Sequence, residues 1–289
     1  MSENIKRLDA SKSKNMYKLF TTILMSLGAL IMLYPLAWMV VSSFKPEAMI
    51  FKDKSLIIKA FTLENYVRGL KGVAGTGFID YIVNSLKVVI PVVIGTLFSC
   101  SFVGYAVARL TFPFRKLVFP VILLTMMLPI HATLIPRYIM FRNLNWIDTY
   151  LPLIVPSFFA IQGFFCYLFI EFMRGIPKEL DQAATVDGCG PITIYFRIIM
   201  PLSVPVFITA AIFSFMWTYD DFFSQLIYIN NPTKFTIALS LRQYTEAFEL
   251  SAFGVLFAMS TLSLIPIFIL FITCQKYLVE GIATTGLKG

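Results

Sequence analysis

Residues 177–201 read PKELDQAATVDGCGPITIYFRIIMP, a polar, helix-forming insert between two long apolar segments. Pro177 suits the first position of a helix, and the acids Glu179 and Asp181 fall in the first turn, where the helix dipole favours negative charge. Gly188 is the residue expected to end this helix. The insert therefore predicts a short, water-exposed helix.

A second short helix is expected after Gly190 and Pro191, because proline favours the first helical position. On the first helix, four residues spaced three or four apart share one face: Leu180, Ala183, Ala184 and Asp187. The paired alanines leave room for another surface to approach closely. A plain amphipathic connector fits the same pattern, so periodicity alone leaves both interpretations open.

The composition around the insert is that of an integral membrane protein. Hydrophobic residues make up 58% of the 289 residues, charged residues only 14%, and the mean hydropathy is +0.78. Six segments are long and apolar enough to cross a bilayer as helices, at about 17–43, 82–108, 117–140, 151–171, 202–222 and 252–274. The sequence predicts an all-α membrane protein with about six transmembrane helices.

Around these segments we expect a polar tail at 1–16, a transmembrane domain at 17–275 and a second tail at 276–289. The first apolar segment is too long for a cleaved signal peptide and is interpreted as a retained helix. The net charge of +8 is spread over loops beside the spans, so no basic module for nucleic acid is expected.

Catalytic and metal-binding patterns are absent from the sequence. His131 is the only histidine, no C-x-x-C pair occurs among the four cysteines, and no phosphate-binding G-x-x-x-x-G-K-[ST] loop is present. The sequence therefore predicts neither an enzyme nor a metal site. Ionisable residues fall near the ends of the spans, which argues against a carrier coupled to ions.

Two places in the spans depart from pure apolarity and are candidates for a substrate pathway. One is His131, which either lines a pathway or is satisfied by a neighbouring helix. The other is the cluster Trp217, Tyr219, Asp220 and Asp221, which either contacts substrate or anchors the end of a helix at the interface. Both alternatives stay open for each.

Several motifs resemble those of permease subunits of ATP-binding cassette importers, in the carbohydrate branch of the maltose type. In the insert these are Gln182-Ala183-Ala184, Asp187-Gly188 and Ile198-Ile199-Met200-Pro201-Leu202. Similar features occur elsewhere, at Ser42-Ser43-Phe44-Lys45-Pro46, Glu64-Asn65-Tyr66, Asn84-Ser85-Leu86 and Tyr105-Ala106-Val107-Ala108-Arg109. Gln182 departs from the family's usual glutamate. The resemblance spans nearly the whole chain.

This resemblance implies the maltose-type permease fold, with the polar insert at about 172–201 as the cytoplasmic EAA loop. In the family this loop docks on an ATP-binding subunit, which assigns docking to Glu179, Leu180, Asp181, Gln182, Ala183, Ala184, Asp187 and Gly188. The implied partners are a second, homologous permease, two ATP-binding subunits that hold ATP and Mg, an extracellular solute-binding protein and a sugar. No cofactor is expected on this chain.

The implied location is the bacterial cytoplasmic membrane, with several spans in contact with lipid and both termini in the cytoplasm. Only a slight excess of Lys and Arg supports this orientation, helped by the basic N-terminus. The outer loop at about 231–244 would contact the solute-binding protein. The alternatives are a permease for a non-sugar solute, such as a polyamine or phosphonate, a secondary carrier, and a membrane scaffold.

Overall fold

The computed structural model describes residues 2–73, 75–247 and 252–286, and every regular element within them is helical. The backbone divides into two compact units. The first unit comprises Met1–Gly69 with Phe248–Leu262, and the second comprises Leu70–Ala247 with Ser263–Gly289.

The longer helices of the chain are those that cross or border the apolar segments. They are α1 (Ser2–Ser43), α4 (Phe78–Arg109), α5 (Arg115–Met127), α6 (Leu134–Asn143), α8 (Gly163–Arg174), α12 (Val204–Tyr219), α14 (Ile237–Ala247) and α15 (Phe253–Gly286). Shorter helices connect them: α2 (Glu47–Ile50), α3 (Glu64–Leu70), α7 (Leu151–Ile154), α9 (Glu179–Val186), α10 (Pro191–Ile194), α11 (Met200–Leu202) and α13 (Phe222–Tyr228). Single turns are η1 (Ile130–Thr133), η2 (Val155–Phe159), η3 (Tyr195–Ile199) and η4 (Pro232–Lys234).

Six membrane spans are compatible with these helices, as the hydropathy predicts. Four stretches are long and apolar enough to cross a bilayer: Met16–Ser43, Phe78–Arg109, Leu151–Arg174 and Phe253–Lys276. Two more spans arise if each of two bent pairs counts as one: Arg115–Met127 with His131–Asn143 at 94°, and Pro191–Leu202 with Val204–Tyr219 at 76°. The third predicted span, 117–140, is thus a broken helix, whereas the fifth, 202–222, contains the continuous helix α12 and is bent only where the preceding segment joins it.

The first unit joins the end of α1 to the start of α15. The carboxylate of Glu47 accepts hydrogen bonds from the backbone N–H groups of Phe253 and Gly254, both at 2.8 Å. These N–H groups lie in the first turn of α15, where no helical carbonyl is available to them. At the other end, α1 begins at Ser2, so the helix continues through the region expected to be a separate polar tail.

The second unit is built around α4, which packs closely against α8. A Cβ added to Gly104 would lie only 2.5 Å from the Cβ of Phe169 on α8, so this contact requires a residue without a side chain. The Ser99 hydroxyl donates a hydrogen bond to the Ser157 carbonyl in η2 at 2.7 Å. A glycine and short polar side chains thus let the helices approach while the backbone groups stay bonded.

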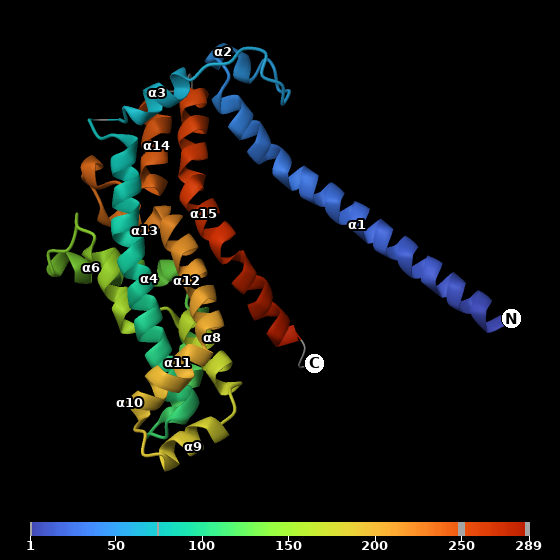
Figure 1. The fold of residues 1–289 in the computed structure, drawn as a ribbon. Helices are drawn as coiled ribbons and strands as arrows, with labels where there is room; N and C mark the ends of the chain where they lie inside the picture. Colours follow the sequence, from blue (N-terminus) through green and yellow to red (C-terminus); the bar gives the residue numbers. More distant parts are fainter. Residues whose placement is uncertain (1, 74, 248–251, 287–289) are drawn as a thin grey trace. The chain divides into compact units, whose positions relative to one another are not determined.

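The length of α4 separates the two ends of the second unit. At about 1.5 Å per residue, the 25 residues between Asn84 and Arg109 span roughly 37 Å, more than the roughly 30 Å hydrocarbon core of a bilayer. In Figure 1, α9 and α10 lie near the C-terminal end of α4, whereas α14 lies beside its N-terminal part. Groups bonded to Asn84 and groups bonded to Arg109 therefore lie at opposite ends of the helix.

Candidate functional site

The polar insert folds as the sequence predicts, with α9 starting at Glu179 and ending at Val186. Gly188 has φ of +82°, the left-handed conformation that glycine adopts readily after a helix. The N–H of Gly188 bonds the Thr185 carbonyl at 3.0 Å, and the N–H of Cys189 bonds the Ala184 carbonyl at 2.9 Å. The last carbonyls of α9 are thereby satisfied as the chain turns towards α10.

The inward face of α9 differs from the one that periodicity groups together. Ala184 is only 6% exposed and belongs to the apolar core of the second unit, with Tyr105, Met173 and Tyr195. Its neighbour Ala183 is exposed. The two alanines therefore face different surroundings, and only Ala183 can meet a second protein directly.

Six of the eight predicted docking residues are exposed: Glu179, Leu180, Gln182, Ala183, Asp187 and Gly188. The remaining two, Asp181 and Ala184, turn towards this chain's own helices. Val186 adds an apolar side chain, 88% exposed, to the outward surface. We call the six exposed residues together with Val186 the outward face of the insert. It combines acidic, small and apolar side chains.

Arg109, in the last turn of α4, holds the segment before α9. Its guanidinium donates to the Ile176 carbonyl at 2.7 Å and lies 3.5 Å from the carboxylate of Asp181. The Arg109 side chain is 1% exposed, whereas that of Asp181 is 23% exposed. Nε and Nη1 of Arg109 and Oδ1 of Asp181 are buried and form no hydrogen bond in the structure. This ion pair is therefore longer and less fully hydrogen-bonded than a well-formed buried one.

Tyr105, one turn earlier on α4, holds the segment after α9. Its hydroxyl donates a hydrogen bond to the Pro191 carbonyl at 2.9 Å. The Tyr195 ring lies 5.2 Å from the Tyr105 ring, and the Tyr195 hydroxyl shares a 2.7 Å hydrogen bond with Ser101. The insert is thus fastened to α4 on both sides of α9, so α9 and the end of α4 form one mechanical unit.

The turn that follows α10 is a π-helical turn, η3. The N–H of Met200 bonds the carbonyl of Tyr195 five residues earlier. Pro201 has no N–H with which to continue an α-helical pattern, and the wider turn accommodates this loss. The chain then bends by 76° into α12.

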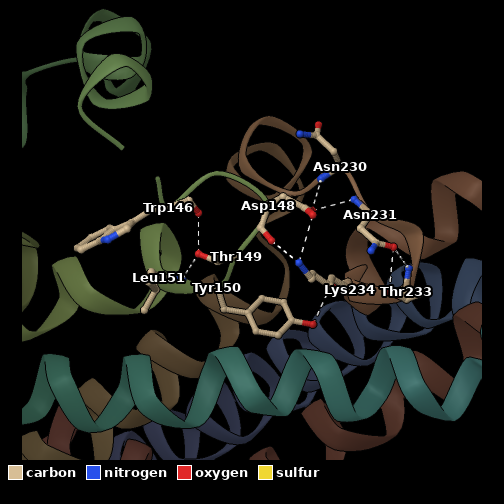
Figure 2. A network of polar contacts seen from close by, with 9 residues as sticks. All are labelled: Trp146, Asp148, Thr149, Tyr150, Leu151, Asn230, Asn231, Thr233 and Lys234. Carbon is tan, nitrogen blue, oxygen red and sulfur yellow. Dashed lines mark hydrogen bonds and ion pairs between the residues drawn. The ribbon is translucent and has the colours of Figure 1, made fainter. Parts of the chain in front are cut away.

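A second polar network lies at the opposite end of the second unit, in the loops after α6 and after α13 (Figure 2). The carboxylate of Asp148 accepts hydrogen bonds from the backbone N–H groups of Asn230 and Asn231, at 3.1 and 2.9 Å. The ammonium of Lys234 lies 3.2 Å from the same carboxylate, and the Tyr150 hydroxyl donates to the Lys234 carbonyl at 3.0 Å. The loop at 230–235 is therefore held by side chains from a distant part of the sequence.

The ionised form of Asp148 is the one that this network binds. Burial alone would raise the pKa of the Asp148 carboxyl, but the N–H groups of Asn231 and Asn230 and the Lys234 ammonium outweigh it and lower the pKa below its usual value. From α4, the Asn84 amide donates to the carbonyls of Thr233 and Phe235 at 2.9 and 3.1 Å. The 230–235 loop is therefore fastened to the N-terminal part of α4.

The predicted pathway residues are not gathered into one site. His131 is exposed, and its ring lies 5.3 Å from Phe223 in an edge-to-face arrangement. Trp217 is half exposed and packs on Phe164 at 5.0 Å. Neither residue lines the cavity bordered by Phe98 and Phe158 or the groove bordered by Arg115 and Arg174.

The other members of the Trp217 cluster have structural partners or lie at the surface. Tyr219 is buried, and its hydroxyl donates to the Ser263 carbonyl at 2.9 Å. Asp221 caps α13 by accepting a hydrogen bond from the Ser224 N–H at 3.0 Å, and Asp220 is exposed at the end of α12. Within the described residues, no group of three or more His, Cys, Asp or Glu side chains is arranged to hold a metal ion.

Sequence reasoning missed the roles of Arg109 and Asp148. Arg109 stands in a short basic turn and contributes there to the positive-inside count, while Asp148 lies in a loop of ordinary polar composition. Arg109 carries one local signal, a basic residue in the last turn of a long apolar helix. Nothing in the sequence pairs Asp148 with a loop some 80 residues away.

Comparison with known proteins places the chain in a family. Residues 100–284 match the family described as "Binding-protein-dependent transport system inner membrane component". A probable ABC transporter permease protein of Bacillus subtilis, YurM, is 33% identical over 256 residues, covering 89% of this chain and 84% of that protein. The trehalose/maltose transport system permease protein MalG of Thermococcus litoralis is 30% identical, covering 92% and 97%.

A further relative resembles the chain in sequence, and a solved structure resembles it in fold. The galactooligosaccharides transport system permease protein GanQ of Bacillus subtilis is 29% identical, covering 94% of this chain and 95% of that protein. The fold matches a chain of a crystal structure of a bacterial ABC transporter involved in the import of the acidic polysaccharide alginate, with a TM-score of 0.80 and 20% identity, covering 92% and 97%. The chain is therefore a multi-pass membrane permease that belongs to the family of binding-protein-dependent transport system inner membrane components.

Proposed function

We propose that this chain is one membrane-spanning subunit of an ATP-driven importer for a sugar or oligosaccharide. The observation that carries the proposal is the outward face of the polar insert, which is exposed on a helix fastened to α4 by Arg109 and Tyr105. Such a surface suits docking on an ATP-binding subunit. The substrate class is supported by relatives named for trehalose and maltose and for galactooligosaccharides.

The importer would contain a second, homologous permease, two ATP-binding subunits that hold ATP and Mg, and an extracellular solute-binding protein. When ATP draws the ATP-binding subunits together, α9 would move with the one on which it docks. Because α4 runs unbroken from Phe78 to Arg109, motion at Arg109 reaches the loop held by Asn84 as a rigid-body displacement. The permease then needs no catalytic side chain of its own.

The polar insert would lie in the cytoplasm, with both termini, and the 230–235 loop outside. The length of α4 supports opposite faces for these two places, and the acidic, exposed insert suits a soluble partner. In a background without the four native cysteines, a membrane-impermeant thiol reagent should label Asn231→Cys in intact cells. It should label Thr185→Cys only after the membrane is opened. The reverse pattern would invert the orientation.

The test of the proposed function is uptake by the reconstituted importer. This chain, its sister permease, the ATP-binding subunits and the solute-binding protein are placed in liposomes with ATP on the cytoplasmic side. The transported probes are radiolabelled disaccharides and oligosaccharides that the solute-binding protein retains. We expect accumulation with ATP and none with a non-hydrolysable analogue.

Two controls separate the alternatives. The chain alone, given a proton or sodium gradient, should accumulate nothing, and gradient-driven uptake would establish a secondary carrier instead. Uptake that requires ATP but selects a polyamine or phosphonate over every sugar would support an ATP-driven importer and contradict the assignment of a sugar as its substrate.

A further inference from the structure

An open groove of about 760 Å³ lies beside the end of α4, between the start of α5 and the end of α8. Three cationic side chains line it, Arg115, Lys116 and Arg174, and no acidic side chain does. The rest of the lining is almost entirely apolar, with Leu117, Phe119 and further side chains from the same turn. The groove thus pairs a cationic rim with an apolar wall.

The three cations differ in how they are held. Nε and Nη2 of Arg115 donate to the carbonyls of Val107 and Ala108 at 2.8 and 3.0 Å, which fixes this guanidinium at the end of α4. Arg174 lies 4.2 Å above the Phe119 ring and pairs with Glu171 at 2.8 Å. Lys116 is exposed and forms no ion pair with any residue in the described ranges. Even counting Glu171, the groove keeps an excess of positive charge.

The turn that leads into the groove exposes large apolar side chains. Phe114 is 78% exposed with φ of +63°, a left-handed conformation that is unfavourable for a bulky residue. Leu117, three residues later, is 60% exposed. A strained backbone that directs a phenylalanine outward beside cations suits an environment of acyl chains and charged headgroups, not water.

The groove lies at the same end of α4 as the polar insert, because Val107 borders it and Arg109 fastens the insert. In the proposed orientation this end is the cytoplasmic interface. The cytoplasmic leaflet is rich in anionic lipids, and basic pockets between helices on that side bind their headgroups.

We propose that this groove binds an anionic phospholipid. Its phosphate and headgroup would contact Lys116, Arg174 and the free N–H groups of Arg115, while its acyl chains would lie along Leu117 and Phe119. The choice of leaflet rests on the proposed orientation, but the charge and the apolar wall do not. The lipid would bridge α5 and α8 close to the insert and so stabilise the end of α4 to which the insert is fastened.

The experiment compares lipid retention by purified importer variants in nanodiscs of phosphatidylcholine containing a minor fraction of phosphatidylglycerol. Lys116→Gln combined with Arg174→Gln removes two cations and leaves Arg115 to hold the end of α4. Lys87→Gln is the matched control, because Lys87 is an exposed lysine near the other end of α4. Native mass spectrometry counts the phosphatidylglycerol that stays bound after transfer to detergent.

We expect the unchanged protein and the Lys87→Gln control to retain one more phosphatidylglycerol per chain than the double variant, whose apparent affinity should fall roughly tenfold or more. Equal retention by all three would overturn the proposal. So would displacement of the lipid by inorganic phosphate, which would indicate a general phosphate site, or capture of a protein subunit by a photocross-linker placed at position 116. Because lipid counting requires no transport, its result is separable from failure of the uptake experiment.

Discussion

Asp181→Ala is expected to destabilise the folded permease by about 3 kcal/mol, because it leaves the buried guanidinium of Arg109 without a carboxylate. The side chain of Arg109 is 1% exposed and cannot regain water without moving the end of α4. The Ile176 carbonyl remains as a hydrogen-bond partner but carries no charge. The expected readout is a lower midpoint of thermal unfolding for the purified importer in detergent.

The double variant Arg109→Met with Asp181→Ala should recover more than half of that loss, because it removes the buried charge together with its partner. Uptake per ATP hydrolysed should be lower than normal in the double variant, since α4 then holds the insert by hydrogen bonds only after α9, such as that from Tyr105 to Pro191. Asp187→Ala is the matched control. It removes an exposed acid just after α9, and we expect it to change stability by less than about 0.5 kcal/mol. A neutral Asp181→Ala would mean that the 3.5 Å ion pair contributes nothing to stability.

The local structure of the insert could be predicted because local chemistry determines it. Pro177 and two acids mark the start of α9, and Gly188 takes the left-handed conformation that ends it. These preferences act within one or two helical turns, so neighbouring residues in the sequence are sufficient. The six apolar segments were predictable for a similar reason, since each satisfies its own backbone hydrogen bonds within a helix.

The inward face of α9 could not be predicted, because it depends on contacts made far along the chain. Ala183 and Ala184 are the same residue type at adjacent positions, and periodicity placed both on one face with Leu180 and Asp187. Ala184 turns inward and joins the buried apolar cluster that also contains Tyr105 of α4 and Tyr195 after α10. The hydrogen bond from Tyr105 to Pro191 helps to hold the chain after α9 against α4, and no local pattern encodes it.

The breaks in the membrane spans could not be predicted either, because they too depend on contacts with residues far along the chain. Pro35, Pro91 and Pro266 stand inside apolar segments and lie within continuous helices. The third segment instead bends by 94° between α5 and α6, just where Pro129 precedes η1. Whether a proline bends or breaks a helix depends on which neighbouring groups satisfy the freed carbonyl, and those neighbours are tertiary.

The second prediction with a large expected effect follows from the different surroundings of Ala183 and Ala184. Ala184→Trp should prevent normal folding, because an indole has no space among Tyr105, Met173 and Tyr195 in the core of the second unit. Overpacking by a few methylenes already costs about 1–3 kcal/mol, and the change from alanine to tryptophan is far larger. The expected result is loss of folded, membrane-inserted chain in detergent extracts.

Ala183→Trp should leave the fold intact and act only on assembly, because its side chain points away from the chain's own helices. A bulky ring on the outward face would hold the ATP-binding subunit away from α9. Retention of that subunit on co-purification should then fall roughly tenfold or more, the factor expected for a misfit of more than about 1.4 kcal/mol. Ala183→Ser, which adds one oxygen, is the matched control and should assemble normally. Normal assembly and normal uptake by Ala183→Trp would show that the outward face of the insert is not the docking surface, whatever becomes of Ala184→Trp.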